Sequence, residues 1–213
     1  MTLRTRAVCP RGATLIISEV GPAHGRPVLL SPPLDIGLRA LQPVMEGLAS
    51  RGYRVFAGDH RGQGTNAVKR GHLDITLTGM TADAMSVIDG LGLRKPHVVG
   101  QGLGGLVALA LAAWRPDLIA SATAIAASAE ADDHRETSAS ILDDLRGCRL
   151  PVLALSGAGE RPTPHHISGA AVAAVPGGRQ VTNVALGQLD VLIEHLEEQF
   201  AIADHASGDA TDG

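Results

Sequence analysis

Short apolar runs alternate with longer segments of helical period along this chain, and this alternation limits the possible folds more than any other feature. Runs typical of buried strands lie at residues 27–31, 53–59, 96–100, 118–127 and 151–157. Helical spacing lies between them, at residues 36–52, 80–93 and 103–117. Strands alternating with helices predict βαβ units, and therefore a doubly wound, mostly parallel sheet with helices on both faces. Ligands of such folds bind at the carboxyl ends of the strands.

The boundaries of several elements can be predicted from single residues. Residues 13–20 alternate as an edge strand does, and the helix over 36–52 is expected to end at Gly52. Thr81 is the expected cap of the next helix. A short helix at 163–178, a strand at 180–186 and an amphipathic helix at 188–200 complete the pattern. We expect one domain over residues 1–203 and a disordered polar tail over 204–213.

Composition narrows the function classes. Aromatic residues make up 2% of the chain and hydrophobic residues 45%, so the core must consist of aliphatic side chains. The net charge is −4, and no run of Lys or Arg suggests nucleic-acid binding. No apolar segment has the length of a membrane span, and the first residues do not resemble a signal peptide. Cys9 and Cys148 are expected to be free thiols in a cytoplasmic protein that needs no metal or cofactor.

The stretch VVGQGLGGLVA, from Val98 to Ala108, matches two motifs that imply different chemistry. Its glycines form G-x-G-x-x-G, the dinucleotide-binding fingerprint. They also form the frame of G-x-S-x-G, the nucleophile elbow, with Gly102 in the place of the serine. A dinucleotide site normally lies in the first βαβ unit and has an acid about twenty residues on. Here two strand–helix pairs come first, and no acid follows until Glu130, so the elbow is the favoured interpretation.

The order of segments from Val28 to about Phe200 resembles the α/β-hydrolase superfamily, in its esterase and haloperoxidase-like branch. The resemblance is carried by GYRVFAGDHRGQG and by the long block from Met80 to Ile119. It implies an α/β-hydrolase fold, with a serine nucleophile, a histidine base, an orienting carboxylate and two backbone N–H donors for the oxyanion. Residues 128–140, where relatives insert a helical lid, are too few for one, so a minimal or absent cap is expected.

The resemblance places unsuitable residues at the triad positions. Gly102 stands at the nucleophile position and has no side chain that could attack a substrate. Gln188 stands at the histidine position, and glutamine does not titrate near neutral pH. Glu160 matches the acid, with Glu130 or Asp132 as the alternative after the preceding strand. The sequence therefore predicts a degenerate triad.

The resemblance also predicts the surroundings of the site. Pro33 falls at the position of one oxyanion donor and has no N–H, which leaves the Leu103 amide alone; a shift of one residue would make Leu34 the second donor. Asp35 is the best candidate for a carboxylate with a new acid–base role. The expected pocket consists of Pro33, Leu34, Asp35, Gln101, Gly102 and Leu103. His60 is expected to belong to a structural turn with Asp59 and Arg61, and His165 and His166 to lie at the surface.

Three functions follow from this pattern. The favoured one is a non-catalytic pseudoenzyme that binds a small molecule or a partner protein. The second is a non-hydrolytic enzyme, such as an isomerase or lyase, that uses the same pocket. The third is a true ester or amide hydrolase whose nucleophile has moved to Ser31, Ser128 or Ser156, none of which lies in an elbow motif.

Overall fold

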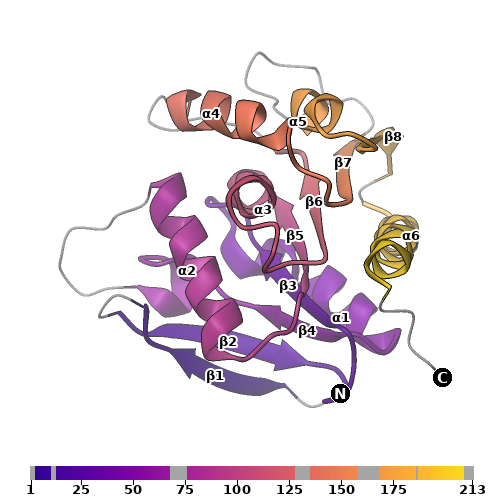
Figure 1. The fold of residues 1–213 in the computed structure, drawn as a ribbon. Helices are drawn as coiled ribbons and strands as arrows, with labels where there is room; N and C mark the ends of the chain where they lie inside the picture. The colour runs from indigo at the N-terminus through magenta and orange to yellow at the C-terminus, as the bar shows by residue number, and fades with distance from the viewer. Residues whose placement is uncertain are drawn as a thin grey trace.

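The computed structural model describes residues 3–10, 13–67, 76–127, 135–157, 168–185 and 187–208. These residues form one twisted sheet with helices on both faces (Figure 1). The strands are β1 (Arg4–Val8), β2 (Leu15–Val20), β3 (Pro27–Ser31), β4 (Arg54–Ala57), β5 (His97–Gln101), β6 (Ser121–Ile125), β7 (Val152–Gly157) and β8 (Arg179–Val184). Their spatial order is β1-β2-β4-β3-β5-β6-β7-β8, antiparallel for β1, β2 and β4 and parallel from there on. The predicted fold class is confirmed.

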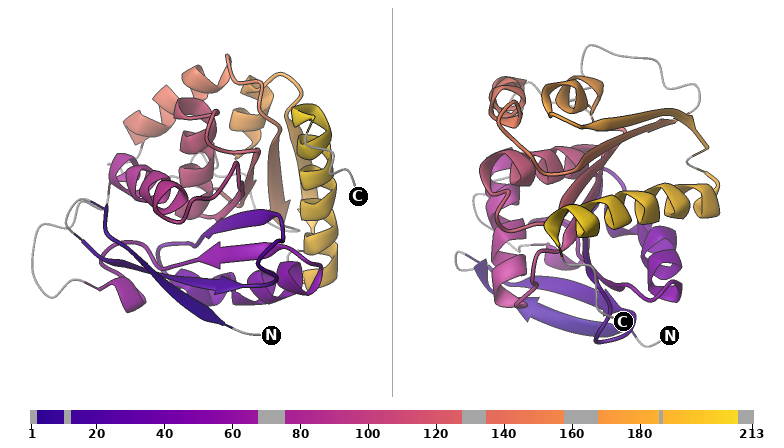
Figure 2. Two further views of the ribbon diagram at one scale, coloured as in Figure 1. Left: turned by 60° about the horizontal axis from the view of Figure 1, so that its bottom comes forward. Right: turned by 45° about the vertical axis from the view of Figure 1, so that its right-hand side comes forward.

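Helices of the described chain divide between the two faces. The helices are α1 (Gln42–Ser50), α2 (Leu77–Gly90), α3 (Leu103–Trp114), α4 (Arg135–Leu145), α5 (Ser168–Ala174) and α6 (Leu189–Ser207). One aliphatic core lies between the sheet and α2, α3, α4 and α5. The other lies between the sheet and the pair α1 and α6, which Figure 2 shows side by side. No helix of the described residues is long and apolar enough to cross a membrane.

Helix α3 shows why so few aromatic residues suffice. Its residues from Leu106 to Ala112 have no exposed surface, because the sheet, α2 and α4 surround the helix. Alanine and branched aliphatic side chains let these layers approach closely, and interiors packed in this way leave few voids. This central helix follows β5 directly, so it fixes the turn between them at the middle of the sheet.

Several boundaries differ from the predicted ones. The edge strand is β1, which the sequence did not reveal, and residues 13–20 pair on both sides as β2. Helix α2 begins four residues before the expected cap: Thr76 accepts the Gly79 N–H at 3.1 Å, and Thr81 lies inside the helix and donates to the Leu77 carbonyl at 2.7 Å. Threonine suits both positions, so sequence spacing did not separate them.

Other differences concern helix ends. The helix expected over 36–52 divides into a 3₁₀ turn at Gly37–Ala40 and α1. Helix α4 was not predicted; it packs on α3 and α5, and no cap is evident over the sheet among the described residues. Helix α6 continues to Ser207, so the start of the expected tail is helical.

A buried acid joins the antiparallel strands. The side chain of Glu19 on β2 has no exposed surface and pairs with Arg4 at 3.1 Å, Arg6 at 2.6 Å and Arg54 at 2.9 Å. Burial acts to raise the pKa of Glu19, but hydrogen bonds from Arg6 and Arg54 outweigh it and lower the pKa to about 2. The three cations come from β1 and β4, so this ionic cluster ties both neighbours to β2.

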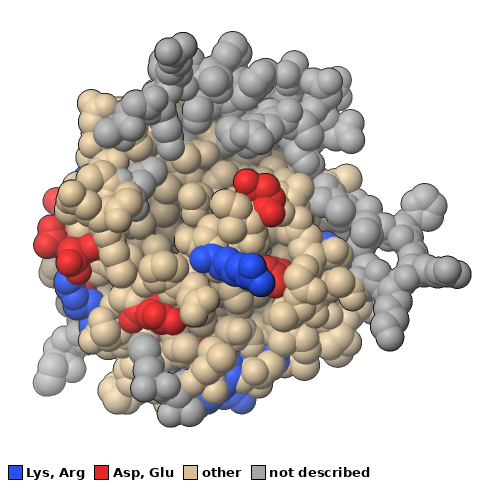
Figure 3. Space-filling model, turned by 180° about the vertical axis from the view of Figure 1, so that it is seen from behind, with Lys and Arg blue, Asp and Glu red and all other residues tan. Residues whose placement is uncertain are grey.

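Among the described residues, neither sign of charge dominates the face seen in Figure 3. Acidic and basic side chains of the described residues lie there among a larger uncharged area. Neither cysteine forms a disulfide: Cys9 is exposed and Cys148 is buried.

Candidate active site

Gly102 forms a sharp turn between β5 and α3. Its φ of 57° and ψ of −123° lie where glycine is favoured and other residues are strained. The Gly102 N–H donates to the Ile125 carbonyl of β6 at 2.9 Å, and the Gly102 carbonyl accepts from the Gly105 N–H at 3.0 Å. This strand–turn–helix geometry, at the carboxyl end of a central strand, is that of a nucleophile elbow.

The neighbouring glycines are required by close packing. A Cβ on Gly100 would lie 1.9 Å from the Gly104 carbonyl oxygen, and a Cβ on Gly104 would lie 2.0 Å from that of Ser31. Helix α3 therefore contacts the backbones of β5 and β3 directly. Packing of helix on sheet accounts for these glycines without a dinucleotide, which supports the elbow interpretation.

Pro33 forms the wall opposite Gly102. A Cβ on Gly102 would lie 3.4 Å from Pro33 Cβ and 3.8 Å from its Cα. Pro32 and Pro33 are both buried, and proline has no N–H to offer an oxyanion. Leu103 is the first residue of α3, so its N–H has no acceptor within the helix. The Leu103 amide and the Leu34 amide, the next N–H along the loop, are thus the candidates for backbone donors.

The other predicted site residues occupy varied positions. Gln188 is exposed and is the residue before α6, where its side chain makes no capping bond. Asp35 is exposed, whereas Leu34, Gln101 and Leu103 are half-buried. Glu160, His165, His166, Glu130, Asp132 and Ser128 lie outside the described residues. The structure thus brings Gly102, Leu103 and Pro33 together and leaves Asp35 facing solvent.

The alternative serine nucleophiles are poorly placed for attack. Ser31 is 6% exposed and ends β3, where its carbonyl contacts the region of Gly104. Ser156 is half-buried within β7, and neither serine stands on a sharp turn between a strand and a helix. A relocated serine mechanism has no support from these two residues.

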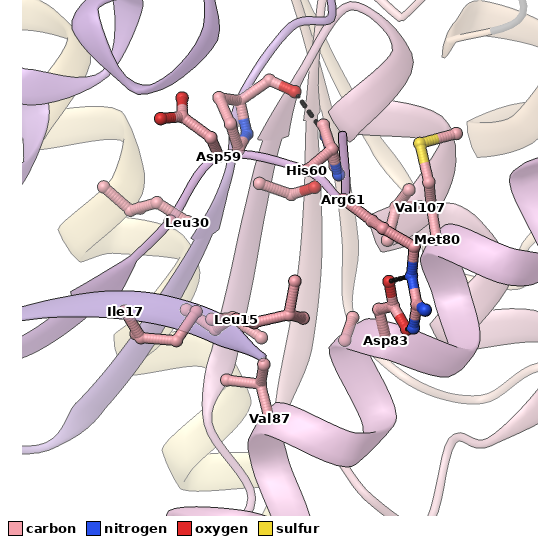
Figure 4. Close-up of a pocket in the computed structure, with 15 residues that line it drawn as sticks. Leu15, Ile17, Leu30, Asp59, His60, Arg61, Met80, Asp83, Val87 and Val107 are labelled. Carbon is pink, nitrogen blue, oxygen red and sulfur yellow. Dashed lines mark hydrogen bonds and ion pairs between the residues drawn. The ribbon is translucent and has the colours of Figure 1, made fainter. Parts of the chain in front are cut away.

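The loop after β4 gives each of its polar side chains a structural partner. Asp59 accepts the Leu38 N–H at 2.8 Å and the Thr65 N–H at 3.1 Å. Arg61 makes a two-pronged ion pair with Asp83 of α2, at 2.9 and 2.5 Å. His60 Nε2 donates to the Pro32 carbonyl at 2.9 Å, and burial lowers the pKa of this imidazole. Dashed lines in Figure 4 mark the bonds of His60 and Arg61.

A cavity lies beneath this loop, between β2, β3 and α2. Its cavity volume is about 40 Å³, and Leu15, Met80, Asp83 and Val87 are among its lining residues (Figure 4). Sites for small organic ligands usually measure about 300–1,000 Å³. This space accommodates water but not a substrate of that size.

A serine, a histidine and an aspartate do come together, but at the amino ends of β5 and β6, away from Gly102. His97 Nδ1 lies 2.9 Å from Ser121 Oγ, and its Nε2 lies 3.4 Å from Asp204 of α6. Arg26 donates to Asp204 at 2.6 and 3.1 Å, and the His97 ring stacks on Phe200 at 4.2 Å. The side chains of His97 and Ser121 have no exposed surface, so no substrate can reach them.

This buried cluster therefore fastens α6 to the sheet. Burial lowers the pKa of His97 despite the neighbouring Asp204, so the imidazole is neutral at pH 7. Sequence reasoning missed the cluster, because His97, Ser121 and Asp204 share no motif. Only the parallel register, which pairs His97 with Ser121, brings the first two together.

The backbone is strained at Ala126, beside the elbow. Ala126, directly after β6, has a φ of 47°, which side-chain-bearing residues rarely adopt. Its N–H donates to the Leu155 carbonyl at 2.9 Å, next to the Ile125 carbonyl that holds Gly102. Strained backbone of this kind gathers at functional sites. Sequence reasoning missed Ala126, because alanine gives no sign of a left-handed conformation.

The fold and the elbow define the α/β-hydrolase class, and comparison with known proteins agrees. The family model described as "alpha/beta hydrolase fold" matches residues 37–147, and the chain belongs to this family. An enol-lactonase structure from Burkholderia xenovorans covers 92% of the chain and 100% of its own, with a TM-score of 0.76 and 17% identity. A proline iminopeptidase from Mycobacterium smegmatis has a TM-score of 0.79 and 14% identity, over 96% and 100% of the two chains.

Curated relatives are named as hydrolases. One from Variovorax paradoxus, "Putative carbamate hydrolase RutD", is 35% identical over 116 residues, which are 54% of this chain and 42% of the relative. A second, "3-oxoadipate enol-lactonase 1" from Acinetobacter baylyi, is 31% identical over 105 residues, 49% of this chain and 38% of the relative. The chain thus spans about two fifths of the length of these relatives.

These names overturn the favoured sequence-based function. The expectation of a non-catalytic pseudoenzyme with a degenerate triad is wrong, since the relatives point to a hydrolase. The same finding replaces the expected isomerase or lyase. The residues at the predicted triad positions did not predict the function, because the function was read from a few aligned positions, whereas the curated relatives match over about half of the chain.

Proposed function

We propose that this chain hydrolyses a small, reactive carbonyl compound, such as an ester, lactone or carbamate, by direct attack of water at the carboxyl end of β5. The observation that carries the proposal is the elbow itself, with Gly102 at φ 57° and the Leu103 amide at the start of α3. The names of the relatives, a carbamate hydrolase and an enol-lactonase, support the substrate class.

Direct attack by water follows from the residue at position 102. Glycine forms no acyl-enzyme, so no covalent intermediate arises at the elbow. Its missing side chain leaves room in front of Pro33, since a Cβ there would make only ordinary contacts at 3.4 and 3.8 Å. We expect a water molecule to lie where a serine hydroxyl would otherwise be. It adds to the substrate carbonyl carbon, loses a proton to solvent, and expels the leaving group from the tetrahedral intermediate.

The backbone supplies the stabilisation of that intermediate. The Leu103 N–H is free of helical bonding and points from the N-terminal end of α3, where the helix dipole favours negative charge. Leu34 provides the second N–H along the facing loop. In serine hydrolases stripped of triad members, the oxyanion hole and substrate binding still give about 10³–10⁴-fold acceleration over water. We expect acceleration of that size, which suits substrates with good leaving groups.

One pair of variants tests the proposal. Leu103→Pro removes the N–H, yet proline is tolerated at the first position of a helix; Leu103→Ala trims the same side chain and keeps the N–H. With p-nitrophenyl acetate and p-nitrophenyl N-methylcarbamate as probes, we expect kcat/KM of Leu103→Pro to fall about 100-fold below that of Leu103→Ala. Equal rates for the two variants, or no hydrolysis by the unmodified protein, would show that the proposal is wrong. A burst of p-nitrophenol in the first turnover would exclude direct attack by water.

A further inference from the structure

The loop opposite Gly102 is held by the polar loop that follows β4. His60 Nε2 donates to the Pro32 carbonyl at 2.9 Å, and Gln63 Nε2 donates to the Leu34 carbonyl at 2.5 Å. Between them, the Pro33 carbonyl accepts the Gly37 N–H at 3.1 Å. Three successive peptide groups, which follow Pro32, Pro33 and Leu34, are therefore each fixed through the carbonyl oxygen.

These bonds set the direction of one N–H. The Leu34 N–H belongs to the same peptide group as the Pro33 carbonyl, and in a trans peptide the two point in opposite directions. The bond to Gly37 therefore turns the Leu34 N–H away from Gly37. A rotation of this peptide group would require its neighbours to rotate as well, and both of those are held by side chains, His60 and Gln63.

Gln63 is an unfavourable residue if only the stability of the fold is considered. Its Oε1 is buried and has no hydrogen-bond partner among the described residues. An unsatisfied buried oxygen is unfavourable, and a leucine of similar size would avoid it. What the residue contributes is the hydrogen bond that its other polar atom, Nε2, donates to the Leu34 carbonyl. Polar residues that break a stability rule in this way tend to serve a function.

We infer that His60 and Gln63 are positioning residues, which keep the Leu34 N–H aimed at the oxyanion beside Gly102. They touch no reacting atom and act through the two peptide groups on either side of this N–H. The inference rests on the proposed function, because it assigns the second oxyanion donor of that same site. Pro32 and Pro33 have no N–H, so Leu34 is the first residue of this loop whose amide can donate a hydrogen bond. The loop therefore depends on one N–H, and the orientation of that peptide group has to be held.

The variants His60→Leu and Gln63→Leu test this inference, with His60→Gln as the conservative variant and Thr65→Val as a control on the same loop. Thr65 hydrogen-bonds Asp59 and, among the described residues, makes no hydrogen bond to the loop of Pro32 to Leu34. For both leucine variants we expect kcat with p-nitrophenyl acetate to fall about tenfold, with KM little changed, because only the transition state carries an oxyanion. His60→Gln should recover part of kcat, and Gln63→Leu should melt no lower than the unmodified protein.

Hydrogen exchange supplies a reading that is independent of activity. Amides of residues 34–41 should exchange faster in both leucine variants and unchanged in Thr65→Val. An unchanged kcat in Gln63→Leu, while Leu103→Pro is strongly impaired, would overturn this inference and leave the proposed function standing. A lower melting temperature with unchanged kcat per folded molecule would overturn it as well, since it would show a purely structural role. If Leu103→Pro and Leu103→Ala hydrolyse equally, the proposed function itself fails.

Discussion

Pro33 lies against the turn at Gly102, at a distance that leaves room for a side chain there. A Cβ on Gly102 would be 3.4 Å from Pro33 Cβ, within ordinary van der Waals contact. The glycine is therefore not demanded by crowding, unlike Gly100 and Gly104, where a Cβ would meet backbone oxygens at 1.9 and 2.0 Å. What favours glycine at this position is its φ of 57° and the space it leaves for water.

Gly102→Ser should fold but should not become an efficient serine esterase. We expect it to lose about 1–2 kcal/mol of unfolding free energy, because a side chain disfavours this backbone conformation. Gly92→Ser is the control: Gly92 has a φ of 62° with nothing within 4 Å, so it tests the backbone strain away from the site. Denaturant unfolding measures both costs.

The catalytic part of this expectation concerns Gln188. The sequence predicts Gln188 at the histidine position, and glutamine accepts no proton near neutral pH, so we expect the new serine to lack a base. Steady-state and first-turnover kinetics with p-nitrophenyl acetate should therefore show no burst for Gly102→Ser. A stoichiometric burst would contradict the assignment of Gln188 to the histidine position.

Gly104→Ala should be among the most destabilising single changes in the chain. Its Cβ would lie 2.0 Å from the Ser31 carbonyl oxygen and 2.6 Å from that of Pro32, so α3 would have to move away from β3. We expect a loss of about 3 kcal/mol or more in unfolding free energy, in the range of severe overpacking.

Gly47→Ala is the matched comparison for that variant. Gly47 lies within α1, and the nearest atom to an added Cβ is Ile193 Cδ1 at 3.2 Å, the end of a flexible side chain. Alanine favours a helix by about 1 kcal/mol over glycine, which offsets the closer contact. If both variants unfold at the same denaturant concentration, the close approach of α3 to β3 is not the reason for glycine at position 104.

Acid should weaken the fold through Glu19. Its pKa is about 2 in the folded protein and 4.5 ordinarily, so the folded state binds this proton less readily than the unfolded chain. The stability that this carboxylate contributes is therefore present above pH 4.5 and is lost as the pH falls from 4.5 towards 2.

The variant Glu19→Gln separates this contribution from others. At pH 7 it should unfold more easily by about 2 kcal/mol, because three arginines lose a charged partner. The difference from the unmodified protein should shrink as the pH falls towards 2, and urea unfolding at a series of pH values would show it. A difference that stays constant down to pH 2 would mean that the Glu19 charge is not what holds Arg4, Arg6 and Arg54.

The local hydrophobic pattern of the sequence predicted the central parallel strands well. It predicted the edge of the sheet, at β1, poorly. Strands β3 to β7 are short apolar runs between helical segments, so periodicity reveals them. Strand β1 reads RTRAV and is mostly exposed. Two of its arginines, Arg4 and Arg6, form ion pairs with Glu19 on the neighbouring strand β2, and these help to hold β1 in place. Such cross-strand charges leave no periodic trace in the sequence.

The candidate site divides in the same way. The elbow at Gly102 was predictable. Glycines at this spacing, between a strand and a helix, are needed in this fold for the tight turn and for close packing of the helix on the sheet. The links from His60 to Pro32 and from Gln63 to Leu34 were not, since they join loops 28 and 29 residues apart through single atoms. His60 was expected to belong to a structural turn of its own loop, but its bond reaches the other loop.

The sequence by itself determined the fold. Strands alternate with helices, and the glycines at 100, 102 and 104 allow a tight turn after which the helix packs closely on the sheet. It also determined that no serine attacks from position 102. Only the tertiary structure decided which loop lies against that position and what holds this loop, because both depend on where separate parts of the chain meet. Tertiary structure also placed Ser121 and His97 together in the interior, where burial excludes any substrate, with the half-buried Asp204 beside them.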